Sequence, residues 1–311
     1  MRFLVIGFGN MGCRHTQSII SSYPNAKICV LEPSKDNFEK NCKRINIRST
    51  NIERYSEIEL LNGHFDFCVV ATSAEPRFKI VKLLIEYGIK NLLLEKVVFQ
   101  SQEQFDYIKK LNIKENVNIY CNFVSRYFPN YIEIKKEISK KPFKMIVSGG
   151  DFGLACNSLH YLDIFQYLRK DTSRIVSHNL QENLSGNIRG ENYKELHGAL
   201  YLTNSFGDSL SIISDLEKEK GQLEITILNG DDIHILNENS LNHTIISNTA
   251  IIKKQFKILR TSELTGVIIK DFYNKNILLP KVSETSNNHI QIFKIFNIIF
   301  NLSEFDNCPI T

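Results

Sequence analysis

The first part of the chain alternates short apolar runs with amphipathic segments. Compact, largely apolar runs predict buried strands at Phe3–Ile6, Lys27–Leu31, Phe65–Ala71, Asn91–Leu94 and Asn116–Cys121. Helical patterns separate them at Asn10–Ser21, Ser34–Ile45, Pro76–Tyr87 and Gln102–Leu111, with Ser34 placed to cap its helix. Short buried strands that alternate with helices are typical of a parallel sheet covered on both faces. A doubly wound α/β domain is therefore predicted.

The pattern changes after about residue 122. Helices are expected at Pro129–Ser139, Ser158–Leu168, Ser262–Phe272 and Val282–Leu302. Strand-like runs lie at Phe143–Ser148, Arg174–His178, Ala199–Thr203, Ser209–Ser214, Gln222–Leu228 and Ile233–Ile235. Polar turns at Asn204–Asp208 and Asn229–Asp232 favour antiparallel neighbours. We therefore expect two domains, residues 1–121 and 122–311, the second being α+β with one large open, mostly antiparallel sheet.

Composition excludes several other classes of protein. The 311 residues carry a net charge of +4 that is spread along the chain, which argues against a nucleic-acid partner. The apolar segment Ile290–Leu302 is interrupted by Lys294 and is too short to span a bilayer, so no membrane partner is expected. Seven cysteines without CxxC spacing and the lack of a signal-peptide pattern indicate reduced thiols and a cytoplasmic protein.

A glycine motif follows the first predicted strand and opens the first predicted helix. It is Gly7-Phe8-Gly9-Asn10-Met11-Gly12, a G-x-G-x-x-G. In this position Gly7 allows a tight turn, Gly9 lets the backbone approach a pyrophosphate, and Gly12 allows the helix to pack closely. The pyrophosphate would then lie on the N–H groups that begin the helix, near Asn10 and Met11. The motif predicts a Rossmann-type dinucleotide site, the alternative being a simple glycine turn.

Polar residues at the ends of the next strands extend this prediction. Glu32 ends the second strand, where an acid accepts hydrogen bonds from the adenosine ribose and repels a 2′-phosphate. We therefore expect NAD in preference to NADP, although Lys35 lies nearby in sequence. Thr72 and Ser73 follow the strand that ends at Ala71, where they would line the cofactor cleft or simply form a turn.

Several motifs together resemble one family. They are the glycine motif with His15, then Ala71-Thr72-Ser73, Glu95-Lys96 and His160-Tyr161-Leu162-Asp163, in order along nearly the whole chain. This arrangement resembles the Gfo/Idh/MocA oxidoreductases. The resemblance implies a Rossmann domain followed by an α+β domain whose open sheet often forms a homo-oligomer interface. It also implies NAD(P)-linked oxidation or reduction of sugars, inositols and nucleotide sugars.

The resemblance also implies roles for individual residues. Lys96 matches the catalytic lysine of a Glu-Lys-Pro motif, in which Glu95 is expected beside the cofactor and Val97 replaces the proline. An ammonium at Lys96 would bind the substrate hydroxyl and stabilise alkoxide character. His160 matches the catalytic histidine, which would move the hydroxyl proton. Asp163 lies on the same helix face and would orient that ring or bind substrate. A strand-end lysine, a structural histidine and a surface acid are the alternatives.

The main departure from the family is Cys156, four residues before His160, where many members carry an acid. We expect a small buried thiol there, and no metal site, because a Cys-His pair lacks further ligands. Asn157 would bind substrate or cap the helix. Arg126, in a stretch that begins at Asn122, would bind an anionic group of the substrate or pack against another part of the chain.

These expectations describe an NAD(P)-dependent enzyme that transfers hydride between nicotinamide and a carbinol or carbonyl carbon of a sugar-like small molecule. Cys156 and Val97 keep one alternative open, a dinucleotide-binding sensor or partner subunit without catalysis. A second alternative is an enzyme of the same fold that reduces a substrate other than a sugar, such as an imine or a tetrapyrrole.

Overall fold

The computed structural model describes residues 1–184, 190 and 192–311, and the chain forms two compact units. Residues 1–124 and 259–286 form the first unit, and residues 125–258 and 287–311 form the second. The sequence pattern had assigned everything beyond Asn122 to a second domain. The segment 259–286 instead returns to the first unit, so the chain passes from one unit to the other three times.

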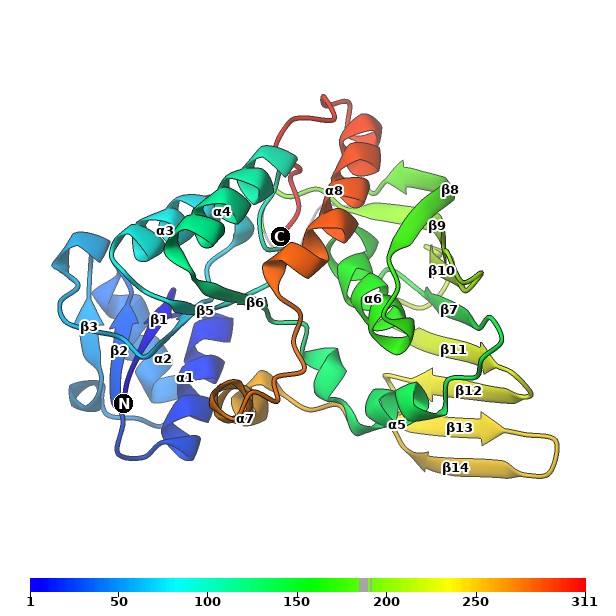
Figure 1. The fold of residues 1–311 in the computed structure, drawn as a ribbon, viewed down its shortest axis with the longest axis horizontal. Helices are drawn as coiled ribbons and strands as arrows, with labels where there is room; N and C mark the ends of the chain where they lie inside the picture. The colour runs from blue at the N-terminus through cyan, green and yellow to red at the C-terminus, as the bar shows by residue number, and fades with distance from the viewer. Residues whose placement is uncertain (185–189, 191) are drawn as a thin grey trace. The chain divides into compact units, whose positions relative to one another are not determined.

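The first unit contains one sheet of six parallel strands. These are β1 (Arg2–Ile6), β2 (Lys27–Leu31), β3 (Glu53–Tyr55), β4 (Phe67–Val70), β5 (Asn91–Leu94) and β6 (Asn118–Cys121). Their order is β3-β2-β1-β4-β5-β6 (Figure 1), which is the order of dinucleotide-binding Rossmann folds. The predicted parallel sheet is confirmed, but β3 was missed because three residues are too few to show a pattern. The order reverses between β1 and β4, where such folds bind ligands.

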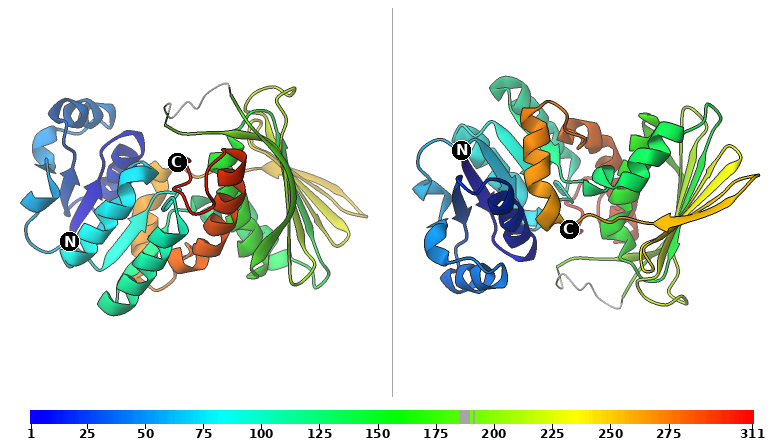
Figure 2. Two further views of the ribbon diagram at one scale, coloured as in Figure 1. Left: turned by 90° about the horizontal axis from the view of Figure 1, so that it is seen from above. Right: turned by 90° about the horizontal axis from the view of Figure 1, so that it is seen from below.

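Helices cover both faces of this sheet. They are α1 (Asn10–Ser22), α2 (Lys35–Arg44), α3 (Ala74–Glu86) and α4 (Gln102–Glu115). Right-handed crossovers in opposite directions from β1 and β4 place α1 and α2 on one face and α3 and α4 on the other (Figure 2). The predicted cap of α2 is confirmed, since the hydroxyl of Ser34 accepts the backbone N–H of Asn37 at 3.1 Å.

Helix α7 (Thr261–Tyr273) packs against α1, from the far end of the sequence. The close approach depends on Gly266, where a Cβ atom would lie 1.9 Å from the Ser22 hydroxyl. The backbone N–H of Gly266 donates to the Ser18 hydroxyl at 3.0 Å. Because this contact joins residues 248 positions apart, no local sequence pattern could reveal it.

The second unit contains a sheet of eight strands. These are β7 (Lys144–Gly149), β8 (Ser173–Glu182), β9 (Leu196–Asn204), β10 (Ser209–Ser214), β11 (Leu223–Asn229), β12 (Asp232–Asn237), β13 (Asn242–Ile246) and β14 (Ile251–Gln255). The order is β14-β13-β12-β11-β7-β10-β9-β8, and only the β7–β10 pair is parallel. The expected mostly antiparallel sheet and both predicted hairpins are confirmed. The sequence pattern missed β13 and β14, because the edge strand β14 is largely exposed and shows no alternation.

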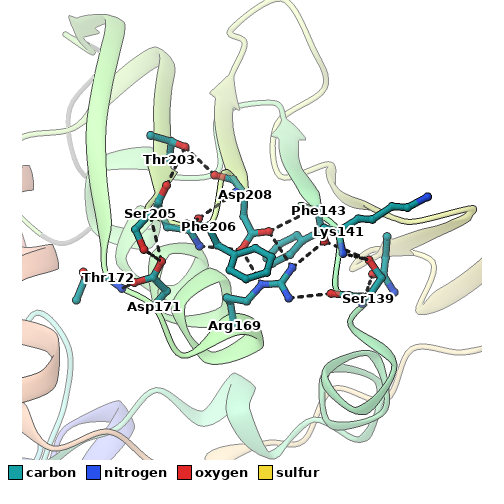
Figure 3. Close-up of polar contacts among 12 residues, drawn as sticks. Ser139, Lys141, Phe143, Arg169, Asp171, Thr172, Thr203, Ser205, Phe206 and Asp208 are labelled. Carbon is teal, nitrogen blue, oxygen red and sulfur yellow. Dashed lines mark hydrogen bonds and ion pairs between the residues drawn. The ribbon is translucent and has the colours of Figure 1, made fainter.

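Helices α5 (Pro129–Glu137) and α6 (Leu154–Arg169) belong to this unit, together with α8 (Val282–Ile299) from residue 287 on. Helices α6 and α8 lie on one face of the sheet (Figure 2). Helix α6 packs on β10, whose alternate residues Leu210, Ile212 and Ser214 are buried. The end of α6 is anchored by Arg169, which pairs with Asp208 at 2.9 Å (Figure 3). Across the residues that the structure describes, every helix is too short or too polar to cross a membrane.

Candidate functional site

The glycine motif forms the turn between β1 and α1. Gly7 has a φ of +81°, a conformation that residues with a Cβ rarely adopt. A Cβ at Gly12 would lie 1.8 Å from the Gly7 carbonyl oxygen, so only glycine allows the helix to start this close to the strand. A Cβ at Gly9 would meet no atom within 4 Å, which leaves the backbone open to an approaching group. The backbone at the three glycines thus has the shape expected of a phosphate-binding turn, and phosphate binding there stays a prediction.

The N-terminal end of α1 fits an anion. Gly9 supplies no side-chain cap, and the first turn carries no acidic residue. Asn10 and Met11 are exposed there, and the amide oxygen of Asn10 accepts a hydrogen bond from Arg44. The N–H groups and the positive end of the helix dipole are therefore available, as a pyrophosphate requires.

Glu32 lies at the end of β2, beside this turn. One of its carboxylate oxygens accepts the backbone N–H of Phe8 at 3.1 Å, and the other accepts that of Ser34 at 3.1 Å. The residue is only 8% exposed, so the carboxylate is held in one orientation. Each oxygen keeps a further lone pair that can accept a ribose hydroxyl. Arg54 binds the adjacent backbone through the carbonyl of Glu32 at 2.9 Å.

Thr72 and Ser73 connect β4 to α3. The Thr72 methyl group would lie 3.0 Å from a Cβ at Gly7, which places Thr72 over the glycine turn. Its hydroxyl oxygen is buried without a hydrogen-bond partner in the protein, as expected of a group that a ligand satisfies. Ser73 is exposed at the start of α3. Both residues thus lie at the edge of the sheet where the sequence placed them, and their contact with a cofactor stays a prediction.

Glu95 is the centre of a buried polar network at the end of β5. Its carboxylate oxygen Oε1 accepts hydrogen bonds from His15 at 2.9 Å and from Asn122 at 2.7 Å. Burial alone would raise the pKa of this carboxyl, but the His15 ring and the Asn122 amide lower it to about 2. The carboxylate expected beside the cofactor therefore already has two partners from α1 and from the end of β6.

Both nitrogens of the His15 ring have hydrogen-bond partners. Its Nδ1 lies 2.8 Å from the hydroxyl of Thr265, which also donates to the carbonyl of Thr261 at 3.0 Å. Its Nε2 lies 2.9 Å from the Glu95 carboxylate. The buried ring therefore joins α1, the end of β5 and α7.

Lys96 directly follows Glu95 and is half-buried. It thus lies at the carboxyl edge of the parallel sheet, together with the glycine turn, Glu32 and Thr72. The peptide bond between Lys96 and Val97 is cis, and Val97 is buried. Lys96 belongs to the first unit, whereas His160 belongs to the second.

His160 lies in the second turn of α6, which begins earlier than the sequence predicted. The helix starts at Leu154 after Gly153, whose φ of +75° allows the chain to turn into it. Asn157 is therefore inside the helix, and the expectation that it caps the helix is wrong. Its amide donates to the carbonyl of Phe152 at 2.6 Å, which stabilises the turn before the helix. The catalytic role of His160 and the substrate-binding role of Asn157 stay predictions.

Cys156 is a buried thiol, 2% exposed, and a carboxylate from another strand lies beside it. Glu195, which precedes β9, accepts the backbone N–H of Ala155 and that of Leu196. Burial raises the pKa of the Glu195 carboxyl, and the two amides and the Cys156 thiol partly offset this effect. Glu195 thus caps the first turn of α6, so a carboxyl group lies next to position 156 although that residue is not an acid.

Arg126 and Asp163 form a bidentate ion pair. The Arg126 Nε lies 2.9 Å from one Asp163 oxygen, and Nη2 lies 2.8 Å from the other. Asp163 is 1% exposed, so the alternative of a helix-surface acid is wrong. The arginine also stacks over Tyr167 at 5.2 Å. The pair fixes the segment Val124–Tyr127 to α6, and binding of substrate by either residue stays a prediction.

Three residues at these sites had no assigned role in the sequence analysis. They are His15, Arg77 and Glu195. His15 lies three residues after the glycine motif, and this spacing was its sequence signal. Arg77 donates to the carbonyls of Glu95 and Val97, and Glu195 accepts the N–H of Ala155. These partners are distant in sequence, so no local pattern distinguishes Arg77 and Glu195 from surface charges. Within the described residues, no group of three His, Cys, Asp or Glu side chains gathers as a metal site.

Comparison with known proteins supports the same interpretation. Residues 1–123 match the Gfo/Idh/MocA model, which is described as an oxidoreductase family with an NAD-binding Rossmann fold. The scyllo-inositol 2-dehydrogenase (NAD(+)) of Bacillus subtilis (strain 168) is 25% identical over 187 residues. That alignment covers 54% of this chain and 54% of the relative, so the match spans about half of each protein.

Solved structures share the fold over nearly the whole chain. A dehydrogenase (MviM) from Clostridium difficile has a TM-score of 0.76 at 19% identity, with 96% of this chain and 99% of the other covered. The UDP-N-acetylglucosamine 3-dehydrogenase GnnA from Acidithiobacillus ferrooxidans has a TM-score of 0.73 at 13% identity, with 98% of each covered. Residues 1–123 are thus similar to the NAD-binding Rossmann domain of the Gfo/Idh/MocA oxidoreductases, and the solved structures share the fold of nearly the whole chain.

Proposed function

We propose that the protein is an NAD(P)-dependent oxidoreductase that acts on a CH–OH group of a sugar, polyol or nucleotide sugar, with NAD preferred. The observation that carries the proposal is the uncapped start of α1, beside an open Gly9 and a Glu32 carboxylate held by two amides. The substrate class is supported by the names of two relatives, one a scyllo-inositol dehydrogenase and the other a UDP-N-acetylglucosamine dehydrogenase.

The residues of the first unit would bind the cofactor and polarise the substrate. The first turn of α1 would bind the pyrophosphate, and Glu32 would accept the ribose hydroxyls. Bound NAD supplies the hydride-accepting carbon of its nicotinamide ring. The ammonium of Lys96, next to the fixed Glu95, would donate a hydrogen bond to the substrate oxygen and stabilise its growing negative charge.

In the second unit, His160 would take the hydroxyl proton during oxidation and return it during reduction. The part of α6 that carries His160 is held on both sides. Before His160, Glu195 and Asn157 fix the start of the helix, and after it, Asp163 binds Arg126. A base needs a constant orientation toward the proton that it moves, and these contacts restrict the helix on which His160 lies.

The test is a coupled binding and turnover measurement on the full chain. We expect NADH to bind with a fluorescence change, and a panel of inositols and UDP-sugars with NAD and NADP to give absorbance at the NADH band. Lys96→Met and His160→Gln should each lower kcat about 100-fold or more while NADH still binds. Lys79→Met, which changes an exposed lysine on α3, is the matched control and should keep full activity.

One outcome favours the alternative of a non-catalytic sensor, which Cys156 in place of an acid motivates. NADH would then bind tightly without turnover of any compound, and substitution of Lys96 would leave the biological activity of the protein intact. Turnover of an imine or a tetrapyrrole, with none of any sugar, would instead refute the substrate class. Loss of the NAD preference in Glu32→Ser would support the role of that carboxylate, because a 2′-phosphate would no longer face a negative charge.

We also propose a homo-oligomer formed through the large sheet. In the described part of the second unit, α6 and α8 lie on one face of the sheet (Figure 2). On β9 the exposed Tyr201 lies between the buried Leu200 and Leu202 and so belongs to the other face, and Val176 of β8 is also exposed. A second copy would cover such a face. Light scattering should show a dimer or larger species, and Val176→Lys with Tyr201→Lys should convert it to a monomer.

A further inference from the structure

Arg77 is a buried cation whose guanidinium donates hydrogen bonds to three backbone carbonyl oxygens. It lies in the first turn of α3 and is 1% exposed. Its Nη1 donates to the carbonyl of Glu95 at 2.5 Å and to the carbonyl of Val97, and its Nη2 donates to the carbonyl of Thr72. The flat guanidinium offers its N–H donors in a fixed plane, so it can hold three carbonyls at set directions, whereas the three donors of an ammonium are tetrahedral and rotate.

The three carbonyls belong to the two strand-end loops of the candidate site. Glu95 and Val97 are the residues on either side of Lys96, so the backbone that carries the lysine is held on both sides. Thr72 lies in the other loop, and its methyl group packs over the turn at Gly7. Arg77 therefore links the backbone around Lys96 to the glycine turn, all within the first unit.

The side chain of Glu95 is held independently by its 2.9 Å contact with the His15 ring and by the Asn122 amide. Arg77 also lowers the pKa of the Glu95 carboxyl by its charge, although less than His15 and Asn122 do. Residues 95–97 are thus restrained twice. Arg77 holds their carbonyls, and His15 and Asn122 hold the Glu95 carboxylate. The side chain of Lys96 then extends from a backbone with little freedom to rotate.

We propose that Arg77 is a positioning residue, which sets the direction of the Lys96 side chain and its spacing from the glycine turn. The inference rests on the proposed function, since it assigns Lys96 and the turn to one reaction site. Arg77 does not touch substrate or cofactor. It acts by keeping the two loops at a constant separation, so that a dinucleotide bound at the turn and an ammonium at Lys96 can serve the same reacting group.

The experiment compares Arg77→Lys and Arg77→Ala with the wild-type chain, by fluorescence titration with NADH. We expect Arg77→Ala to raise the Kd for NADH about tenfold, and guanidinium chloride at about 20 mM to restore most of that loss by filling the vacated position among the carbonyls. Arg77→Lys retains the charge without the planar donors. It should bind NADH within about threefold of wild type but lower kcat about tenfold or more.

Arg169→Ala is the matched control, because Arg169 is another largely buried arginine that donates to two carbonyls, those of Ser139 and Lys141, in the other unit (Figure 3). Its loss should lower the melting temperature and leave the Kd for NADH within twofold, with or without guanidinium. A change of kcat in folded Arg77→Lys is a readout that a merely structural role would not move.

The outcomes separate this proposal from the proposed function. Folded Arg77→Lys with wild-type kcat, or folded Arg77→Ala with a wild-type Kd or no response to guanidinium, would overturn the role of Arg77. If Arg77→Ala does not fold, Arg77→Lys alone decides. If wild type binds NADH but turns over nothing, the proposed function fails, while a guanidinium-restored Kd in Arg77→Ala would still support the link between the loops.

Discussion

His243 should make the second unit less stable as the pH falls. The ring lies on β13 and is 0% exposed. Its Nδ1 accepts the amide N–H of Asn130 at 2.9 Å, and its Nε2 lies 3.2 Å from Nδ1 of His234. The amide orientation follows from Asn130, whose oxygen accepts the N–H of Lys257. A second proton on His243 would thus face a donor in a site closed to water.

The magnitude follows from the pKa of this ring. Burial lowers the pKa of His243 from 6.5 to about 4, and the charges of Lys254 and His234 add to the effect. Because the unfolded chain binds this proton more readily, stability is complete above the unfolded pKa and is lost as the pH falls toward the folded pKa. The loss from this group should be about 1.4 kcal/mol at pH 5.5 and about 2.5 kcal/mol at pH 4.5, relative to pH 8.

Urea unfolding of the full chain at several pH values measures this loss. His243→Gln keeps an acceptor for Asn130 and a donor for His234 but cannot titrate. Between pH 8 and pH 5.5 or 4.5, the variant should therefore lose about 1.4 or 2.5 kcal/mol less unfolding free energy than wild type does. His64→Gln is the control, since the His64 side chain is 78% exposed, and it should leave the pH dependence unchanged. A direct NMR titration completes the test. A midpoint above pH 6 for His243, or an unchanged pH dependence in His243→Gln, would show that the reasoning is wrong.

Three further changes have expected outcomes. Gly9→Ala has open space around its new Cβ, so it should fold normally but bind NADH more weakly. Gly12→Ala places its Cβ 1.8 Å from a carbonyl oxygen, so it should lower the stability of the fold. Melting curves with and without NADH measure both effects. Burial raises the pKa of Glu238 from 4.5 to about 7, so ionisation of this carboxyl costs stability as the pH rises. Glu238→Gln should therefore be more stable than wild type by about 3 kcal/mol at pH 8 and nearly equal to it near pH 4. Asp163→Asn leaves Arg126 without its charged partner and should cost about 3 kcal/mol in urea unfolding, and a cost below about 1 kcal/mol would contradict a strongly coupled pair.

The sequence by itself determined the first sheet and its ligand-binding edge. Apolar runs at β1, β2, β4, β5 and β6, the glycine motif and the Ser34 cap are all local features, in which neighbouring residues decide the backbone conformation. A parallel sheet with crossover helices then follows from chain handedness alone. The hairpins β9–β10 and β11–β12 were equally accessible, since their turns are short and polar.

Only the tertiary structure decided how these elements are joined. Residues 259–286 return to the first unit because Gly266 allows α7 to approach α1, and Thr265 bonds to His15 250 positions away. The start of α6 was misplaced because Glu195, from a distant strand, satisfies the amide of Ala155. Contacts of this kind depend on which surfaces meet after folding. No window of sequence contains both partners, so local patterns cannot predict them.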